Sequence, residues 1–318
     1  MPQPFLPPAA RPDAGPRHLP LAVRLFPLWA LLAGVAAFLV PSPFTRIGPA
    51  VPVLLAFIMF AMGVSLTPAD FGRVFRRPAP VLAGLVLHYG IMPFAAWGIA
   101  RLLSLPPAVA AGLILTGSVS SGTASTVMVL VAGGDVALSV AIGAASTLAG
   151  LVLTPLLARS LMDAGIALDG AALLRGLVSI VALPVLGGLL VNRFASGAVR
   201  QLEPLLAPAS LGAILLVIAV VVAGGRNGLR DAGPVLLAAV ALHNGVGLLG
   251  GYWGGRLLGF PREICRTLAF EVGMQNSGLA ATLATLSIGP AAALPGALFS
   301  VWHNLSGSLL AGWWSRDR

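Results

Sequence analysis

Long apolar tracts follow one another along the whole chain, separated by short polar gaps. An α-helix needs about 20 mostly apolar residues to cross a bilayer. The strands of a membrane β-barrel would instead alternate apolar and polar positions. The pattern therefore predicts ten membrane-spanning helices and indicates no appended soluble domain. The predicted spans cover residues 22–40, 49–67, 79–103, 107–133, 135–158, 173–193, 204–224, 232–257, 263–288 and 291–313.

The composition supports a helical integral membrane protein. Of the 318 residues, 58% are hydrophobic and 9% are charged, whereas a soluble domain is usually about 25% charged. Too few polar residues are present to cover a water-facing surface, so the composition excludes a soluble globular protein. The first 20 residues contain seven prolines, and we expect residues 1–20 to form a disordered tail.

The basic residues indicate how the chain is oriented in the membrane. All 19 of them are arginine, the net charge is +9, and most lie in the gaps between apolar tracts. This placement is typical of topology signals rather than of a nucleic-acid site. With ten spans, both termini share one side of the membrane, and that side carries 13 arginines against 6 on the other. The excess predicts cytoplasmic termini in a multi-pass protein of the cell inner (plasma) membrane.

Two predicted spans carry glycine and polar residues where helix formers are expected at mid-membrane. These stretches are Gly117–Thr126 and Glu271–Gly278. Each favours an unwound segment, which at this depth must be buried in protein or line a water-filled cavity. The two stretches lie at corresponding places in the two halves of the chain, and an odd number of spans, five, falls in each half. This arrangement predicts two inverted repeats, 21–160 and 170–315, with a transporter binding site at the broken helices.

Glu271 is the one acidic residue that lies well inside a predicted span, since the other nine are in tails, loops or span ends. A charge near the bilayer centre costs at least about 2.5–3.5 kcal/mol, and no arginine lies at comparable depth. The carboxylate therefore needs a bound cation, a proton or neutral hydrogen-bond donors. Oxygen atoms of nearby side chains suit a hard cation, and the positive ends of broken helices suit an anion. Together they predict a cation-coupled organic-anion carrier.

The run Glu271-Val272-Gly273-Met274-Gln275-Asn276-Ser277-Gly278-Leu279-Ala280 resembles the signature of the bile acid:sodium symporter family. Gly122-Thr123-Ala124-Ser125, Val136-Ala137-Leu138-Ser139 and Phe60-Ala61-Met62-Gly63-Val64-Ser65-Leu66 also resemble parts of that family, so the resemblance covers roughly 45–315. It implies an all-α fold of ten transmembrane helices, built as two inverted five-helix repeats with broken crossing helices 4 and 9. It also implies a panel domain (spans 1, 2, 6 and 7) and a core domain (the rest), which rock past each other to alternate access.

The resemblance further implies two sodium sites and a substrate site. The first sodium site uses the Glu271 position together with Ser125, Thr126, Ser139 and the position of Gly143. The second uses Glu271, Val272, Met274, Gln275 and His88. The implied substrate contacts are Thr123, Ala124, Asn276 and Ser277, at the crossing. The sequence departs from the family pattern at Thr126 (typically Asn), Gly143 (typically a hydroxyl residue) and His88 (typically Gln). The coupling ion therefore remains open: it is two sodium ions, one sodium ion or a proton, or transport is uncoupled.

Other function classes fit the sequence less well. A membrane-embedded enzyme would need a nucleophile with a base, but no histidine lies near Ser121 or Ser125 in the sequence. A channel would more typically show rings of charges or carbonyls than one acidic group. The related arsenite exporters use a cysteine in span 4, whereas the only cysteine, Cys265, begins span 9 and excludes an intrachain disulfide.

We therefore interpret the chain as a secondary active transporter for Na⁺-coupled symport of an organic anion, either bile-acid-like or a small carboxylate such as pantoate. A proton-coupled or uncoupled organic-anion carrier of the same fold is the alternative. No catalytic residue, nucleic-acid partner or resident cofactor is expected, and Na⁺ is the transported coupling ion. Two polar pairs lie inside spans, His243 with Asn244 and His303 with Asn304. Each pair either contacts a ligand or forms interhelical hydrogen bonds.

Overall fold

All ten predicted spans are helical in the computed structural model, which describes residues 25–66, 78–163 and 165–317. The predicted tail, 1–20, lies outside the described residues. The helices are α2 (Phe26–Leu39), α3 (Ser42–Thr45), α4 (Val51–Ser65), α6 (Pro78–Leu102), α7 (Pro107–Ser118), α8 (Ser125–Ala132), α9 (Val136–Leu161), α10 (Gly170–Gly176), α11 (Leu183–Phe194), α12 (Ser196–Gly224), α13 (Arg226–Leu257), α14 (Arg262–Gly273), α15 (Ser277–Ser287) and α16 (Leu294–Trp314). Five helical segments of the described chain are long and apolar enough to cross a membrane by themselves.

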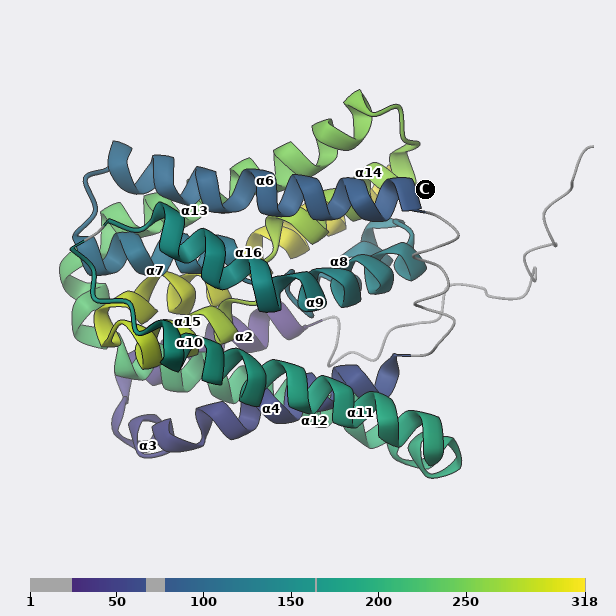
Figure 1. Cartoon of the computed structure of the whole chain (residues 1–318), viewed down its shortest axis with the longest axis horizontal. Helices are drawn as coiled ribbons and strands as arrows, with labels where there is room; N and C mark the ends of the chain where they lie inside the picture. The colour runs from purple at the N-terminus through teal and green to yellow at the C-terminus, as the bar shows by residue number, and fades with distance from the viewer. Residues whose placement is uncertain (1–24, 67–77, 164, 318) are drawn as a thin grey trace, which may run out of the picture.

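The helices form two groups, with α4, α11 and α12 in the lower part of Figure 1 and α6, α13 and α14 in the upper part. In the lower group α4 packs against α11 and α12, and α2 packs against α12. In the upper group α6 packs against α7, α9 and α13, while α13 also packs against α14 and α16. These groups are the panel and core domains that the family resemblance implies.

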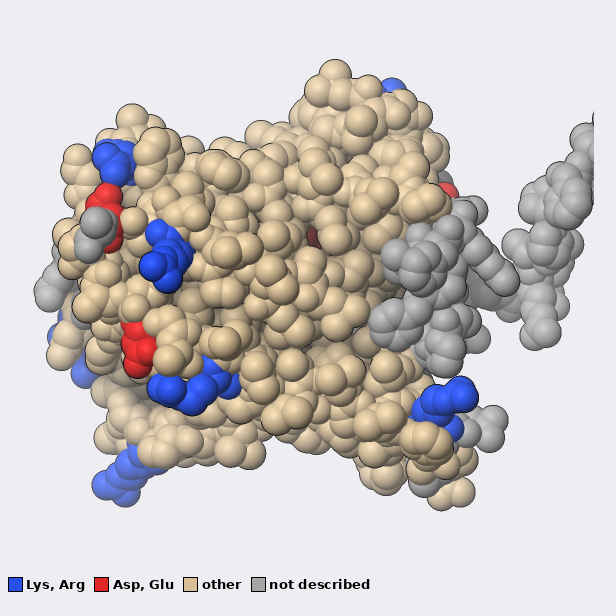
Figure 2. All heavy atoms as spheres, viewed as in Figure 1, with Lys and Arg blue, Asp and Glu red and all other residues tan. Residues whose placement is uncertain are grey.

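The visible surface separates charge from apolar area in the way that a membrane protein requires. Figure 2 shows arginine and acidic side chains mainly towards the two ends of the molecule, and the broad belt between them is tan apart from one small recessed red spot. Many large apolar side chains on the long helices are exposed, including Leu82 and Val86 on α6 and Leu249 on α13. The helices run roughly between the two charged ends (Figure 1), so the belt lies where the hydrocarbon core would be.

Both halves of the chain follow the same order of elements. Each half has two panel helices, a long core helix, a broken core helix and a final core helix. The broken helices are α7–α8 in the first half and α14–α15 in the second, interrupted where glycine and polar residues predicted unwinding. The fold is the predicted all-α architecture of two inverted five-helix repeats.

The sixth span contains a π-helical segment, Leu177–Ala182, between α10 and α11. Pro184 follows closely, and because proline has no N–H it cannot donate the hydrogen bond that an α-helix needs there. In membrane helices, local π-helical adjustments can satisfy the backbone groups that a proline leaves free. The two parts of the span have different neighbours, since α10 packs against α15 of the core whereas α11 packs against α4 of the panel.

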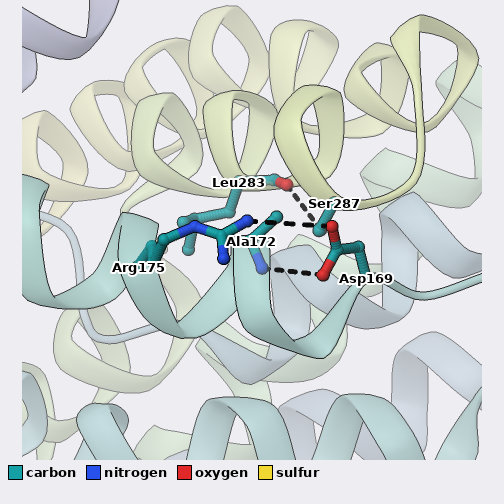
Figure 3. Close-up of polar contacts among 5 residues, drawn as sticks. All are labelled: Asp169, Ala172, Arg175, Leu283 and Ser287. Carbon is teal, nitrogen blue, oxygen red and sulfur yellow. Dashed lines mark hydrogen bonds and ion pairs between the residues drawn. The ribbon is translucent and has the colours of Figure 1, made fainter.

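Polar contacts fix α10 at the edge of the core (Figure 3). The Asp169 carboxylate accepts a hydrogen bond from the backbone N–H of Ala172 at 2.8 Å, which caps the helix, and lies 3.9 Å from the Arg175 guanidinium. The backbone N–H of Asp169 donates to the carbonyl of Ser287 at the end of α15. The sixth span is therefore attached to the core at one end and to the panel at the other.

Two helices begin earlier than their apolar tracts predict. α12 starts at Ser196 rather than at 204, and α13 at Arg226 rather than at 232. Hydropathy marks the edge of the hydrocarbon, whereas a helix continues as long as its backbone hydrogen bonds do. The prediction of the spans is confirmed, and these two starts are wrong by one to two turns.

Candidate ion and substrate site

The two broken helices cross through their backbones at the centre of the core. Ser121 and Gln275 form an antiparallel bridge. The N–H of Gly122 donates to the Met274 carbonyl and the N–H of Asn276 donates to the Ser120 carbonyl, each at 2.9 Å. These bonds satisfy backbone groups that unwinding would otherwise leave without a partner in a water-poor region.

Gly122 is required at the crossing because the two backbones come very close there. A Cβ atom at Gly122 would lie 2.7 Å from the backbone oxygen of Gln275. This contact is closer than real Cβ atoms allow, and the Gln275 oxygen, which accepts from the N–H of Ser277, cannot easily move away.

The Glu271 carboxylate lies beside the crossing and is surrounded by hydroxyl groups. It is fully buried. Oε1 accepts hydrogen bonds from Ser125 and Ser139, and Oε2 accepts one from Ser121, each at 2.6 Å. Within the described part of the chain its side-chain partners are these three hydroxyls and no arginine. Hydrogen bonding to three hydroxyls reduces the cost of burying this polar group.

The remaining predicted positions of the first sodium site lie around this carboxylate. The Thr126 hydroxyl is 2.9 Å from that of Ser139, so it joins the cluster through Ser139 rather than directly. A Cβ atom on Gly143 would be 4.0 Å from Glu271 Oε2 and would meet nothing closer. The structure therefore brings Ser125, Thr126, Ser139 and Glu271 together and leaves space at Gly143.

The predicted residues of the second sodium site lie at the end of α14, where their groups bind one another. His88 is fully buried, with Nδ1 3.0 Å from the backbone oxygen of Glu271 and Nε2 2.9 Å from that of Val119. Gln275 Nε2 donates to the Val272 carbonyl at 2.9 Å. The Met274 carbonyl accepts the crossing bond from Gly122.

A cavity opens beside the crossing, between the two domains. All four predicted substrate positions line it, namely Thr123, Ala124, Asn276 and Ser277. The panel contributes an apolar wall of Leu55, Ile58, Ile214, Val217 and Ile218. His303 and Asn304 of α16 complete the polar side, so this second His–Asn pair lies in the cavity wall.

Three polar atoms of residues in the cavity wall have no hydrogen-bond partner among the described residues. These are Nδ1 of His303, Oδ1 of Asn304 and Oε1 of Gln275, all buried. Buried polar atoms without partners are uncommon in native proteins and often mark a binding function. His243 and Asn244 differ because neither belongs to the cavity lining. His243 Nε2 bonds the Met92 carbonyl while its Nδ1 has no partner among the described residues, and Asn244 bonds both the Gly273 carbonyl and Ser306.

The N-terminal ends of α8 and α15 also border the cavity. Residues immediately before or at each start, Thr123 and Ala124 for α8 and Asn276 and Ser277 for α15, belong to its lining. Asn276 caps α15 through its side chain, whereas α8 has no side-chain cap. The first N–H groups of a helix have no intrahelical partner and carry partial positive charge, so the start of α8 is suited to an anion.

Sequence reasoning did not assign a role to Ser121. Its hydroxyl donates directly to the Glu271 carboxylate. The direction of the side chain cannot be predicted from the sequence, because the residue lies in an unwound segment. The one signal is its place in the repeat, where Ser121-Gly122 corresponds to Ser277-Gly278. No local sequence pattern indicated that the Asn244 side chain bonds the Gly273 carbonyl at the end of α14.

Known proteins similar to this chain are membrane transporters. Residues 52–231 match the model of the Sodium Bile acid symporter family. The uncharacterized sodium-dependent transporter YocS of Bacillus subtilis is 40% identical over 295 residues, which cover 93% of this chain and 92% of YocS. The probable sodium/metabolite cotransporter BASS1, chloroplastic, of Arabidopsis thaliana is 38% identical over 92% of this chain and 73% of its own length.

Among solved structures, the fold is similar to that of the sodium proton antiporter MjNhaP1 from Methanocaldococcus jannaschii, with a TM-score of 0.55 over 93% of this chain and 94% of that one. At 14% identity this likeness shows the fold alone. The family match extends over more than half of the chain, and the identity to YocS extends over nearly all of it. The chain therefore belongs to the sodium bile acid symporter family.

Proposed function

We propose that this membrane protein couples the entry of Na⁺ to the symport of an organic anion, without covalent chemistry. The observation that carries the proposal is a buried carboxylate, Glu271, placed where two broken helices cross beside a cavity. The printed names of YocS and BASS1, a sodium-dependent transporter and a sodium/metabolite cotransporter, support the choice of ion.

The groups around Glu271 fit a hard monovalent cation. The cluster combines the two carboxylate oxygens with the hydroxyls of Ser121, Ser125, Thr126 and Ser139. Each hydroxyl oxygen has lone pairs that can coordinate an ion once its proton turns away. Oxygen-only ligands select hard cations, whereas a transition metal would favour imidazole or thiolate. A bound cation would also neutralise the buried charge.

The cavity fits an anion that carries further polar groups. No arginine belongs to its lining, so the positive potential there comes from the uncapped start of α8. A carboxylate at that helix end would place the rest of the ligand towards α16. Asn304 Oδ1 could then accept a hydrogen bond from a ligand hydroxyl, and His303 Nδ1 could pair with a second polar group. A hydroxy acid such as pantoate meets these requirements, and a bile acid is the larger candidate.

Movement of the panel against the core would open the cavity to either side. The residues of α4 and α12 that line the cavity are all apolar. Beside them the Asn276 amide donates to the Met59 sulfur over a long 3.9 Å, so sliding of the panel along the cavity disrupts little hydrogen bonding. The polar groups that would hold the ion and the anion all lie on the core. We infer from the arginine distribution that both termini are cytoplasmic in the plasma membrane.

The test is uptake into proteoliposomes that contain the purified protein. An inward Na⁺ gradient should drive uptake of labelled pantoate or taurocholate above the rate in an equal K⁺ gradient. Glu271→Gln should reduce Na⁺-driven uptake to the level of empty vesicles, whereas Glu263→Gln, the same change at an exposed position of α14, should not. If uptake is equal in Na⁺ and K⁺ and instead increases with an imposed pH gradient, the proposal of sodium coupling is wrong and the carrier is proton-coupled.

A further inference from the structure

Every backbone carbonyl at the end of α14 lies against a protein nitrogen. The last four carbonyls of a helix have no intrahelical partner and usually face water, a cap or a ligand. Here the Phe270 carbonyl accepts from the N–H of Met274, and the Glu271 carbonyl lies 3.0 Å from Nδ1 of the His88 ring. The Val272 carbonyl accepts from the side chain of Gln275, and the Gly273 carbonyl from that of Asn244.

The unwound segment that follows α14 is also satisfied. The Met274 carbonyl accepts from the N–H of Gly122 and the Gln275 carbonyl accepts from the N–H of Ser277. Six consecutive carbonyls, from residue 270 to residue 275, therefore each have a protein nitrogen within hydrogen-bond distance.

His88 lies where the C-terminal ends of two half-helices converge. Val119, which caps α7, and Glu271, in the last turn of α14, both direct their carbonyl oxygens at the imidazole ring. Such ends carry partial negative charge and, together with unwound backbone carbonyls, can coordinate a cation inside the membrane. The ring of α6 occupies this place instead. The ring lies between the carbonyl oxygens of Val119 and Glu271, and this position does not depend on which ring nitrogen is protonated.

We propose that the protein binds a single sodium ion in each transport cycle, at the Glu271 carboxylate. Among the described residues, His88 fills the other place where the ends of the broken helices come together and could hold a cation. The proposal rests on the sodium coupling proposed above and specifies its stoichiometry. His88 is a positioning residue here, since it acts on the helix ends and touches neither the ion nor the anion.

One acceptor in this region stays without a partner among the described residues. It is Oε1 of Gln275, which is buried. A hard cation needs several oxygen ligands, and one amide oxygen beside carbonyls that are already bonded does not supply them. Gln275 belongs to the cavity lining, so its free oxygen is available to the transported anion instead.

The test is equilibrium binding of radioactive sodium to the purified full-length protein, with ionic strength held constant by K⁺. Binding should saturate at one ion per chain with a Hill coefficient of about one. Saturation at two ions per chain, or a Hill coefficient clearly above one, would overturn the proposal while leaving sodium coupling intact. A complete lack of saturable sodium binding would remove the proposed coupling itself, and the inference with it.

The variant His88→Gln tests the role of the ring. A glutamine amide presents an oxygen and is smaller than imidazole, so it should release carbonyls at the two helix ends and raise the bound sodium from one to two ions per chain. The matched control is His243→Gln, the same change at a buried histidine whose ring bonds the Met92 carbonyl of α6 rather than a carbonyl of α14; it should still bind one ion. If His88→Gln is folded and binds one ion, His88 does not close the second place.

Discussion

The hydroxyl of Ser125 lies 2.6 Å from the carboxylate of Glu271, although the two residues are 146 positions apart in the chain. Ser125 is the first residue of α8 and Glu271 lies in the last turn of α14. The contact therefore joins the start of one half-helix to the end of the other. A ligand bound at this point contacts both repeats at once.

Ser125→Ala should weaken sodium binding without unfolding the protein. The change removes one hydroxyl from the carboxylate, and a hydrogen bond to a charged group contributes about 1.5–3 kcal/mol. The Kd for Na⁺, measured by thermal shift in Na⁺ against K⁺, should rise about tenfold or more. Ser160→Ala removes an exposed hydroxyl that bonds only its own helix, at Leu156, and should leave the Kd unchanged. Equal behaviour of the two variants would show that Ser125 is not a ligand.

Gly143→Ser should strengthen sodium binding. Its Cβ would lie 4.0 Å from Glu271 Oε2 with nothing closer, so a hydroxyl one bond further out reaches the cluster without displacing a neighbour. We expect a Kd for Na⁺ several-fold below that of the unchanged protein, by the scale of about 1 kcal/mol for one added polar contact. Gly143→Ala adds the carbon without the oxygen and serves as the control. A gain that is the same for both variants would indicate packing rather than coordination.

Gly122→Ala should disrupt the crossing. The added methyl group would meet the Gln275 carbonyl oxygen at 2.7 Å, and forcing atoms into a packed site typically costs about 1–3 kcal/mol. The variant should melt at a lower temperature and lose Na⁺-driven uptake. Gly245→Ala, on α13, meets nothing within 4 Å and should keep both properties. Normal uptake by Gly122→Ala would mean that the two backbones do not approach as closely during transport.

Asn304→Ala should separate anion binding from ion binding. The change removes a carboxamide whose Oδ1 lines the cavity without a partner, and it leaves the Glu271 cluster untouched. The KM for the transported anion should rise about tenfold, in proportion to one hydrogen bond of about 1–1.5 kcal/mol. Sodium binding in the absence of the anion should stay the same. A parallel loss of sodium binding would place Asn304 in the ion site instead.

The sequence alone predicts the membrane helices and their two interruptions because both depend on local composition. Apolar tracts locate the spans, and the glycine and polar residues from Gly117 to Thr126 and from Glu271 to Gly278 mark where helices cannot continue at this depth. Glu271 is conspicuous because a lone carboxylate inside a span has a high energetic cost.

Other features depend on packing across the chain and leave no local pattern. The side-chain direction of Ser121 is not set by helical periodicity, because the residue lies in unwound backbone. Asn244 meets the end of α14 from another helix, and the two rings His243 and His303 look alike in sequence although one is bonded to Met92 and the other lines the cavity. The family resemblance implies the position of His88, but only the structure shows that its ring lies between two carbonyl oxygens.

The crossing of the broken helices is made from peptide groups, with the N–H of Gly122 and of Asn276 bonded to carbonyls of the opposite strand. Apart from the space that Gly122 leaves free, this joint does not depend on the chemical nature of the side chains around it. A cavity residue such as Thr123, which caps no helix, can therefore be exchanged while the ion cluster and the helix ends keep their positions. The same backbone crossing can thus be combined with substrates of different size and polarity. A change of substrate then requires different side chains around the cavity and no change of the backbone.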